Sequence, residues 1–153
     1  MDTLPTRAGP RPRTLPRPPH SQLSDNAPVE MQRAVAAFMF SLPGVRDCPS
    51  RISVPGARAM CIDPARCTGP RGAFMVGHEF AHLHPPDDGS LHVCLPADLA
   101  RRAIAAGWAE VHPVASMMGS DTLVMLYGPR DAQELAVVTS LIQASLDFAT
   151  SRP

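Results

Sequence analysis

The stretch GHEFAHLHPPDDGSLHVCL, at residues 77–95, predicts a β-hairpin around which the rest of the chain can be placed. Ala73–His84 has the composition of a long strand, and Ser90–Leu95 that of its hairpin partner. Asp87–Gly89 lies between them and contains the residues that tight turns favour. We therefore expect two antiparallel strands joined by a short turn.

This hairpin carries an unusual density of histidine. His82 and His84 point to the same face of a regular strand, because side chains alternate with a period of two. With the turn centred near Asp87, His82 faces His92 across the hairpin, with Cβ atoms about 4.5–5.5 Å apart. We expect these three imidazoles to share one patch of sheet surface. A shift of one residue in the register would separate them.

The flanking sequence predicts an α+β fold rather than a doubly wound sheet, because hairpins come early and helices come late. No phosphate-binding glycine motif is present, so the sequence gives no basis for a nucleotide site. We expect a single two-layer domain, with a mainly antiparallel sheet packed by helices. The other predicted elements are a helix from Asn26 to Pro43–Gly44, a hairpin at 51–62 turning at Pro55–Gly56, a helix at Ala97–Ala106, a strand at Thr122–Tyr127, and a final helix capped by Asp131.

The first 26 residues differ in composition from the rest of the chain. Six prolines and four arginines alternate there with few apolar residues. Such a segment buries too little apolar surface to offset the entropy lost on ordering. We therefore expect residues 1–26 to form a disordered Pro/Arg-rich tail and residues 27–153 to form the folded domain.

Composition also limits location and partners. The formal net charge is zero, which disfavours nucleic acid and anionic membranes as partners. No apolar run reaches the roughly 20 residues that span a bilayer, and no secretory signal is evident, so we expect a cytoplasmic protein with no membrane partner. The sequence does not indicate an oligomeric state. We expect reduced thiols at the four cysteines, because none forms a C-x-x-C pair: Cys48, Cys61, Cys67 and Cys94.

Three interpretations of the histidine cluster remain open. A divalent transition metal could bind His82, His84 and His92, with Glu79 or His112 completing its coordination. Alternatively, the imidazoles could transfer protons without a metal, since histidine titrates near neutral pH and a neighbouring carboxylate fixes its tautomer. In the third interpretation they are half-exposed strand residues with no chemical role.

Further candidate residues lie after the hairpin and at strand ends. In an extended stretch, Trp108, Glu110 and His112 face the same way and combine an aromatic ring, a carboxylate and an imidazole. Arg58 and Arg130 could bind an anionic oxygen, and Tyr127 could donate a hydrogen bond to a ligand; each of the three could instead have only a structural role. We expect five substrate-binding residues: Arg58, Trp108, Glu110, Tyr127 and Arg130.

Four segments in the order in which they occur resemble the luciferase domain shared by fungal luciferase and many small bacterial proteins. They are EFAHLHP at residues 79–85, DGSLH at 88–92, GWAEVHP at 107–113 and YGPRD at 127–131. The resemblance extends from about Val45 to Phe148. It implies an oxygenase fold that adds dioxygen to a hydroxylated α-pyrone without a metal or organic cofactor, through a peroxide that loses carbon dioxide. The Pro/Arg-rich tail stands where the fungal enzyme has a hydrophobic segment, so membrane attachment is not expected.

The resulting hypothesis is a soluble luciferase-domain protein that binds a planar, hydroxypyrone-like molecule and oxygenates it with dioxygen and no cofactor. A neutral imidazole among His82, His84 and His92 would remove an enol proton, Glu79 would orient it, and Arg58 or Arg130 would stabilise the enolate. His112 completes the expected catalytic group. Two rivals remain open: a metal-dependent enzyme using the same three histidines, and a non-catalytic ligand-binding module whose tail recruits a partner.

Overall fold

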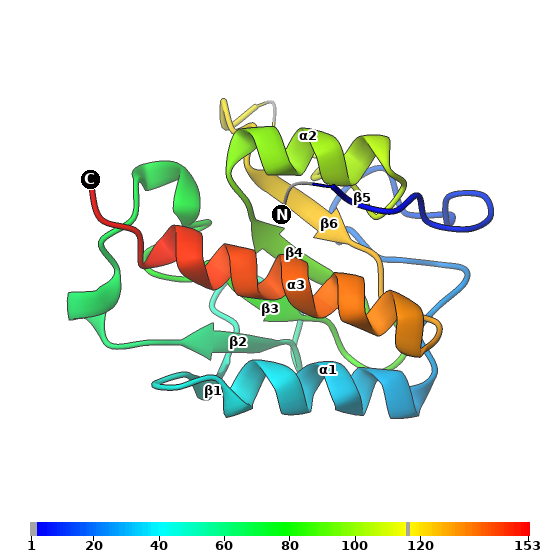
Figure 1. Ribbon diagram of the computed structural model, residues 1–153, viewed down its shortest axis with the longest axis horizontal. Helices are drawn as coiled ribbons and strands as arrows, with labels where there is room; N and C mark the ends of the chain where they lie inside the picture. Colours follow the sequence, from blue (N-terminus) through cyan, green and yellow to red (C-terminus); the bar gives the residue numbers. More distant parts are fainter. Residues whose placement is uncertain (1–2, 116) are drawn as a thin grey trace.

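The protein is described here by a computed structural model covering residues 3–115 and 117–153. Six antiparallel strands form one sheet in the order β1-β2-β3-β4-β6-β5 (Figure 1). The α+β class and the mainly antiparallel sheet packed by helices are as the sequence predicts. The strands are β1 (Arg46–Pro49), β2 (Arg58–Cys61), β3 (Ala81–Leu83), β4 (Leu91–Cys94), β5 (Ala109–Val111) and β6 (Leu123–Leu126).

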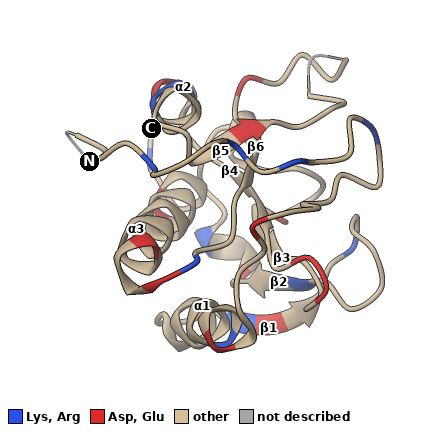
Figure 2. Cartoon of the chain, turned by 90° about the vertical axis from the view of Figure 1, so that its right-hand side faces the viewer, with Lys and Arg blue, Asp and Glu red and all other residues tan. Residues whose placement is uncertain are grey.

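Three α-helices lie on one side of this sheet: α1 (Val29–Ser41), α2 (Ala97–Ala105) and α3 (Ala132–Ala149). Figure 1 shows α3 crossing in front of the central strands with α1 beside it, and Figure 2 shows the loops on the opposite side. The predicted cap of α3 is present, because the Asp131 carboxylate accepts a hydrogen bond from the Glu134 backbone N–H at 2.9 Å. Val138 and Ile142 are fully buried against the sheet, as the apolar stripe of this helix predicts.

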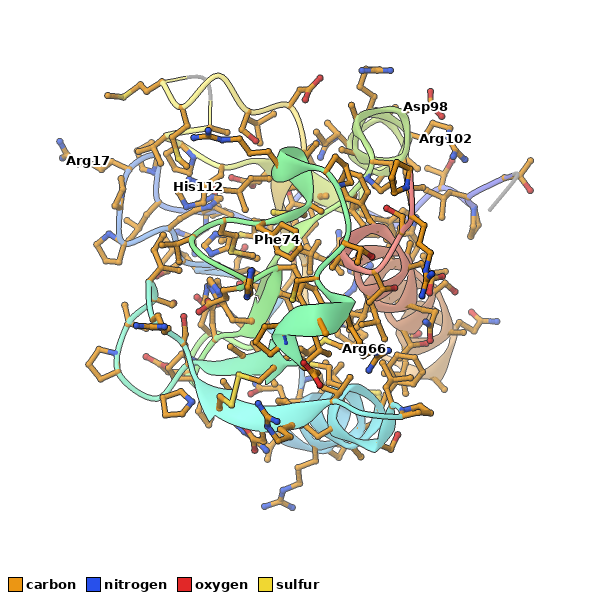
Figure 3. The ribbon with its side chains drawn as sticks, turned by 90° about the vertical axis from the view of Figure 1, so that its left-hand side faces the viewer. Arg17, Arg66, Phe74, Asp98, Arg102 and His112 are labelled. Atoms are coloured by element: carbon orange, nitrogen blue, oxygen red, sulfur yellow. A yellow bond between two sulfur atoms is a disulfide. The ribbon has the colours of Figure 1, made fainter. Side chains whose placement is uncertain are left out.

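The central strands direct apolar side chains to one face of the sheet and histidine to the other. Leu91 and Val93 of β4 belong to the apolar core beneath the helices, together with Val124 and Leu126 of β6. His92 lies between Leu91 and Val93 in the strand, so it points to the other face. We call the two sides the helix face and the loop face. Figure 3 shows His112 among the loops, away from α2 and α3.

The segment before Ala27 is packed against the domain over its described residues 3–26, which corrects the expectation of a disordered tail. His20 and Gln22 are 5% and 2% exposed. Asn26 donates a side-chain hydrogen bond to the Asp88 carbonyl at 2.8 Å, and Trp108 donates one from its indole N–H to the Pro5 carbonyl at 2.7 Å. Apolar burial alone predicts disorder here, whereas this segment is held largely by hydrogen bonds to distant parts of the chain.

The expectation of four reduced cysteines is wrong for two of them, because Cys48 and Cys61 form a disulfide. It joins β1 to β2, where Cys48 pairs with Ala59 and Cys61 pairs with Arg46, so the cysteines lie diagonally across the pair. The sequence placed this hairpin at 51–62, without the strand that contains Cys48. Cys67 and Cys94 are free thiols.

Other predicted boundaries shift by a few residues. Most of the expected strand at Ala73–His84 is loop and a short 3-10 turn, and only Ala81–Leu83 is strand. The helix after Asn26 begins at Val29. None of the helices in the described parts of the chain is long and apolar enough to cross a membrane.

Candidate functional site

The hairpin of β3 and β4 has the register that the histidine argument requires. His82 pairs directly with His92, and the turn is closed by hydrogen bonds from the Asp88 and Gly89 N–H groups to the Pro85 carbonyl, at 2.9 and 3.0 Å. Gly89 has a φ of +76°, a conformation that a side chain would strain. This turn therefore aligns the two strands so that their imidazoles meet.

The three imidazoles are buried and in direct contact. His82, His84 and His92 are 2%, 5% and 6% exposed, so they are not half-exposed strand residues. The Nε2 atoms of His82 and His84 both approach Nδ1 of His92, at 3.1 and 3.0 Å. The predicted cluster is present, with His92 at its centre.

Each outer ring is held by an acceptor on the side away from His92. Nδ1 of His82 lies 2.8 Å from Oε2 of Glu79, whose carboxylate also accepts hydrogen bonds from the Ser50 hydroxyl and the Arg51 N–H. Nδ1 of His84 lies 2.8 Å from the Ser90 hydroxyl, which donates to the Asp88 carboxylate. Glu79 therefore has the orienting position that the sequence argument gave it.

A fourth histidine, His20, enters the cluster from the N-terminal segment, where the sequence argument expected none. Its side chain is fully buried, with Nδ1 3.0 Å from Nε2 of His92 and Nε2 2.8 Å from Oε2 of Glu110. The other Glu110 oxygen accepts a hydrogen bond from the Tyr127 hydroxyl at 2.8 Å. No spacing signal could reveal His20, because 72 residues separate it from His92.

His112 completes a group of five imidazoles. Its ring centroid lies 4.6 Å from that of His92 and 5.3 Å from that of His20, and its Nδ1 accepts a hydrogen bond from the Val114 N–H at 3.2 Å. The sixth histidine, His78, is exposed and contacts Phe74 instead. The five clustered rings therefore come from three separate parts of the chain.

Burial keeps much of this cluster uncharged. It lowers the pKa of His84 to about 3 and that of His112 to about 4, and it places the pKa of His92 well below its usual value. Burial alone would raise the pKa of Glu79 and Glu110, but hydrogen bonds to their carboxylates outweigh it and lower both pKa values. Neutral imidazoles are thus combined with ionised carboxylates.

The remaining predicted site residues divide into two groups. Glu110 and Tyr127 belong to the hydrogen-bonded network behind His20. Trp108 is buried in the core, and neither arginine lines the cavity beside the histidines. Arg58 is paired with Asp47 at the exposed edge of the sheet, and Arg130 is paired with Glu134. The expectation that Arg58, Arg130 and Trp108 would surround a ligand here is therefore not met.

A pocket of about 520 Å³ lies over the histidine cluster on the loop face, within the usual size range of small-molecule sites. One wall is polar and is formed by the five clustered histidines with Asp88. The other walls are mainly apolar and include Ile52, Val54, Met75, Val114, Met118 and Leu123, with Pro18 and Pro19 of the N-terminal segment. A ligand here would meet many ring nitrogens and few formal charges.

The fold and this site define an α+β protein with a buried imidazole cluster beneath a pocket of small-molecule size. Residues 77–145 match the luciferase domain family. The match lies within the region where the sequence motifs resemble it. It contains four of the five clustered histidines and excludes His20.

Proteins named luciferase from fungi are similar to this chain over 78 residues. The identity is 38% to the protein of Armillaria ostoyae, 37% to that of Armillaria gallica and 35% to that of Neonothopanus nambi. The similar region covers 49% of this chain and 29% of each of these relatives. No solved structure matches the chain.

Proposed function

We propose that this protein is a small-molecule oxygenase, which binds a planar, oxygen-rich compound of the hydroxypyrone type in the pocket over the histidine cluster and adds dioxygen to it. The observation that carries the proposal is the combination of one imidazole-lined wall with apolar walls in a pocket of about 520 Å³. The match of residues 77–145 to the luciferase domain family supports oxygenation as the reaction, since the similar fungal proteins are named luciferases.

The imidazole wall suits the first step of such a reaction. An electron-rich enolate can react with dioxygen directly, so the protein must first help a hydroxyl group of the substrate to lose its proton. In the cofactor-free form of the mechanism, His82 accepts that proton at Nε2, because Glu79 holds the hydrogen of the same ring at Nδ1. Neither Arg58 nor Arg130 lines the pocket, so the newly protonated His82 ring would have to stabilise the enolate.

The remaining steps would follow from the chemistry of the substrate. The enolate carbon forms a bond to dioxygen, and the resulting peroxide breaks down to carbon dioxide and an oxidised product. Water would interfere with such an intermediate. The apolar walls formed by residues such as Val54, Val114 and Leu123 favour the exclusion of water from the pocket.

Oxygen uptake tests this proposal. The full chain is mixed with a series of hydroxy-α-pyrones, and dioxygen consumption and carbon dioxide release are measured together. We expect equal amounts of the two gases to be exchanged. His82→Ala should slow uptake by about 10²–10⁴-fold, the usual contribution of a general base. His78→Ala is the matched control, because His78 is exposed outside the cluster, and it should leave the rate unchanged.

A second variant tests the location of the ligand. Val54 lines the pocket and is 38% exposed, so Val54→Trp should obstruct the pocket without overpacking the core. Val111 is 54% exposed and lies outside the pocket, which makes Val111→Trp its control. We expect only Val54→Trp to abolish pyrone binding measured by calorimetry. Failure of every hydroxypyrone to bind the parent protein, or equal binding to both variants, would contradict the proposal.

A further inference from the structure

We propose that the cluster is a binding site for one divalent transition metal ion, coordinated by His82 Nε2, His84 Nε2 and His92 Nδ1. These three ligand atoms lie within 4.8 Å of one another on side chains that are all buried. Imidazole nitrogen suits the later first-row metals, from iron to zinc. The positions of the ring hydrogen atoms support this site, and the site does not depend on oxygenation being the reaction.

The outer partners determine which nitrogen of each outer ring carries its hydrogen. Glu79 accepts at Nδ1 of His82, because a carboxylate has no hydrogen to donate. The Ser90 hydroxyl uses its hydrogen for Asp88, so it accepts from Nδ1 of His84. In its neutral form each of these imidazoles has one ring hydrogen, so that Nε2 of His82 and Nε2 of His84 then carry lone pairs.

Both of these lone pairs point at a single atom, Nδ1 of His92, at 3.1 and 3.0 Å. On the other side of this ring, Glu110 accepts from Nε2 of His20, which leaves Nδ1 of His20 as a third lone pair facing His92. Neutral His92 has one hydrogen to offer to three acceptors. In either tautomer of His92, at least one buried nitrogen at the Nδ1 side is left without a hydrogen to accept, which is unfavourable.

A metal ion at the Nδ1 side removes this deficit. It would accept the lone pairs of His82, His84 and His92 together, and the single hydrogen of His92 would then lie on Nε2 and be donated to His20. Every ring nitrogen of these four histidines would have a partner. The outer acceptors Glu79, Ser90 and His20 would occupy the positions that carboxylates and other acceptors take behind metal-binding histidines.

The spacing of the nitrogens agrees with this assignment. Tetrahedral zinc with Zn–N bonds of about 2.0–2.1 Å places its ligand atoms about 3.3 Å apart. The contacts from Nδ1 of His92 to the other two rings, at 3.1 and 3.0 Å, are close to that separation. Three protein ligands leave a coordination position for a pocket ligand, the arrangement of catalytic rather than structural metal sites.

A second group of imidazoles, formed by His20, His92 and His112, is also close enough to hold an ion. An ion there would need the Nε2 lone pair of His92, which would move the hydrogen of His92 to Nδ1. That single hydrogen could satisfy only one of His82 and His84. The first group is therefore the better site, and the two groups make different predictions for variants.

A bound metal would also change the role of His82. A nitrogen that is coordinated to a metal has no lone pair with which to accept a proton, so His82 would be a ligand and not the base. In that form the metal would offer an open coordination position to the substrate hydroxyl, and a group other than His82 would have to accept its proton. Measurements of metal binding and of oxygen uptake therefore test separate statements.

The test uses the full chain without a polyhistidine tag, treated with a chelator and then dialysed. Zn²⁺ is titrated into it by calorimetry, and Co²⁺ is titrated while visible absorption is recorded. We expect one ion per chain, a Kd below about 1 µM, and cobalt bands typical of four or five ligands. No heat and no rise in the thermal midpoint at about 100 µM Zn²⁺ would overturn the proposal without any variant being needed.

Variants locate the ion. His84→Gln should weaken zinc binding by at least 100-fold, whereas His78→Gln should bind as the parent does. His20→Ala removes only an acceptor behind a ligand, so it should weaken binding by about 10–100-fold. Loss of binding in His20→Ala and His112→Ala with retention in His84→Gln would place the ion in the second group and refute this site. A zinc-binding protein that takes up no oxygen with hydroxypyrones would refute the proposed reaction and leave the metal site standing.

Discussion

The helix face and the loop face of the sheet are both buried, but they are stabilised in different ways. On the helix face, apolar side chains such as Leu91, Val93 and Ile142 are removed from water by the helices, and packing supplies the stability. On the loop face, imidazoles and carboxylates are buried under chain that is mostly irregular, and hydrogen bonds must compensate for lost hydration. The buried polar cluster therefore lies on the face of the sheet opposite the apolar core.

Ile142→Ala should disrupt the apolar packing on the helix face. Ile142 is fully buried, so truncation should lower the free energy of unfolding by about 2–5 kcal/mol through lost transfer energy and a residual cavity. Urea denaturation measures the change. Val111→Ala, at a side chain 54% exposed, should stay within about 0.5 kcal/mol of the parent. A loss below about 1 kcal/mol for Ile142→Ala would show that the helix face is not the main source of stability.

Reduction of the disulfide should act on neither face directly, because Cys48 and Cys61 join the edge strand β1 to its neighbour β2. The bond closes a short loop, with a sequence separation of 13. Its loss in Cys48→Ser should lower the free energy of unfolding by about 3 kcal/mol in the chain-entropy description. The denaturation midpoint of the parent with and without reductant provides an independent measurement. Equal midpoints would contradict a stabilising bond.

Deletion of residues 1–23 should remove stabilising hydrogen bonds from the loop face. It removes His20, whose ring bonds to His92 and Glu110, and the Pro5 carbonyl that accepts from Trp108. With a net contribution of about 0.5–1.5 kcal/mol per hydrogen bond, offset by the entropy of the freed segment, we expect a loss of about 1–3 kcal/mol. Calorimetry should show this as a thermal midpoint lowered by several degrees. An unchanged thermal midpoint would mean that the segment does not stabilise the domain.

The reactivity of Cys94 reports on the loop face without a change in stability. Cys94 follows His92 on the same side of β4, yet it is 1% exposed, and burial raises its pKa to about 12. The reactive thiolate is therefore scarce below pH 10, and we expect no alkylation of Cys94 by iodoacetamide in the native protein at pH 8. Mass spectrometry after alkylation, with unfolded protein as the control, measures this. Rapid modification of native Cys94 would show that the loop face opens readily.

The sequence predicted the elements whose signals are local. The apolar stripe of α3 and its Asp131 cap appear within one helix, and the pairing of His82 with His92 follows from one turn. Both arguments depend on periodicity over a few residues, which a single sequence displays. The histidine cluster was therefore predictable to the extent that one hairpin forms it.

The parts that escaped prediction depend on contacts between distant segments. His20 lies in a proline-rich stretch whose composition indicates disorder, and its partners Glu110 and His92 are many residues away. The Cys48–Cys61 bond required the register of β1, which has no clear strand pattern. Arg58 and Arg130 were assigned by residue type, but each has an acidic partner that the sequence could not place beside it.

The position of His20 also determines the smallest portion of the chain that could be transplanted with its site intact. The region that matches the luciferase domain family begins at residue 77, and it contains neither His20 nor Ser50, which donates to Glu79. A fragment cut to those limits would also lack α1, β1 and β2, and would turn β3 into an exposed sheet edge. In this chain the region that matches the family is thus smaller than the unit that forms the histidine cluster, and a designed fragment should include His20 rather than start at residue 77.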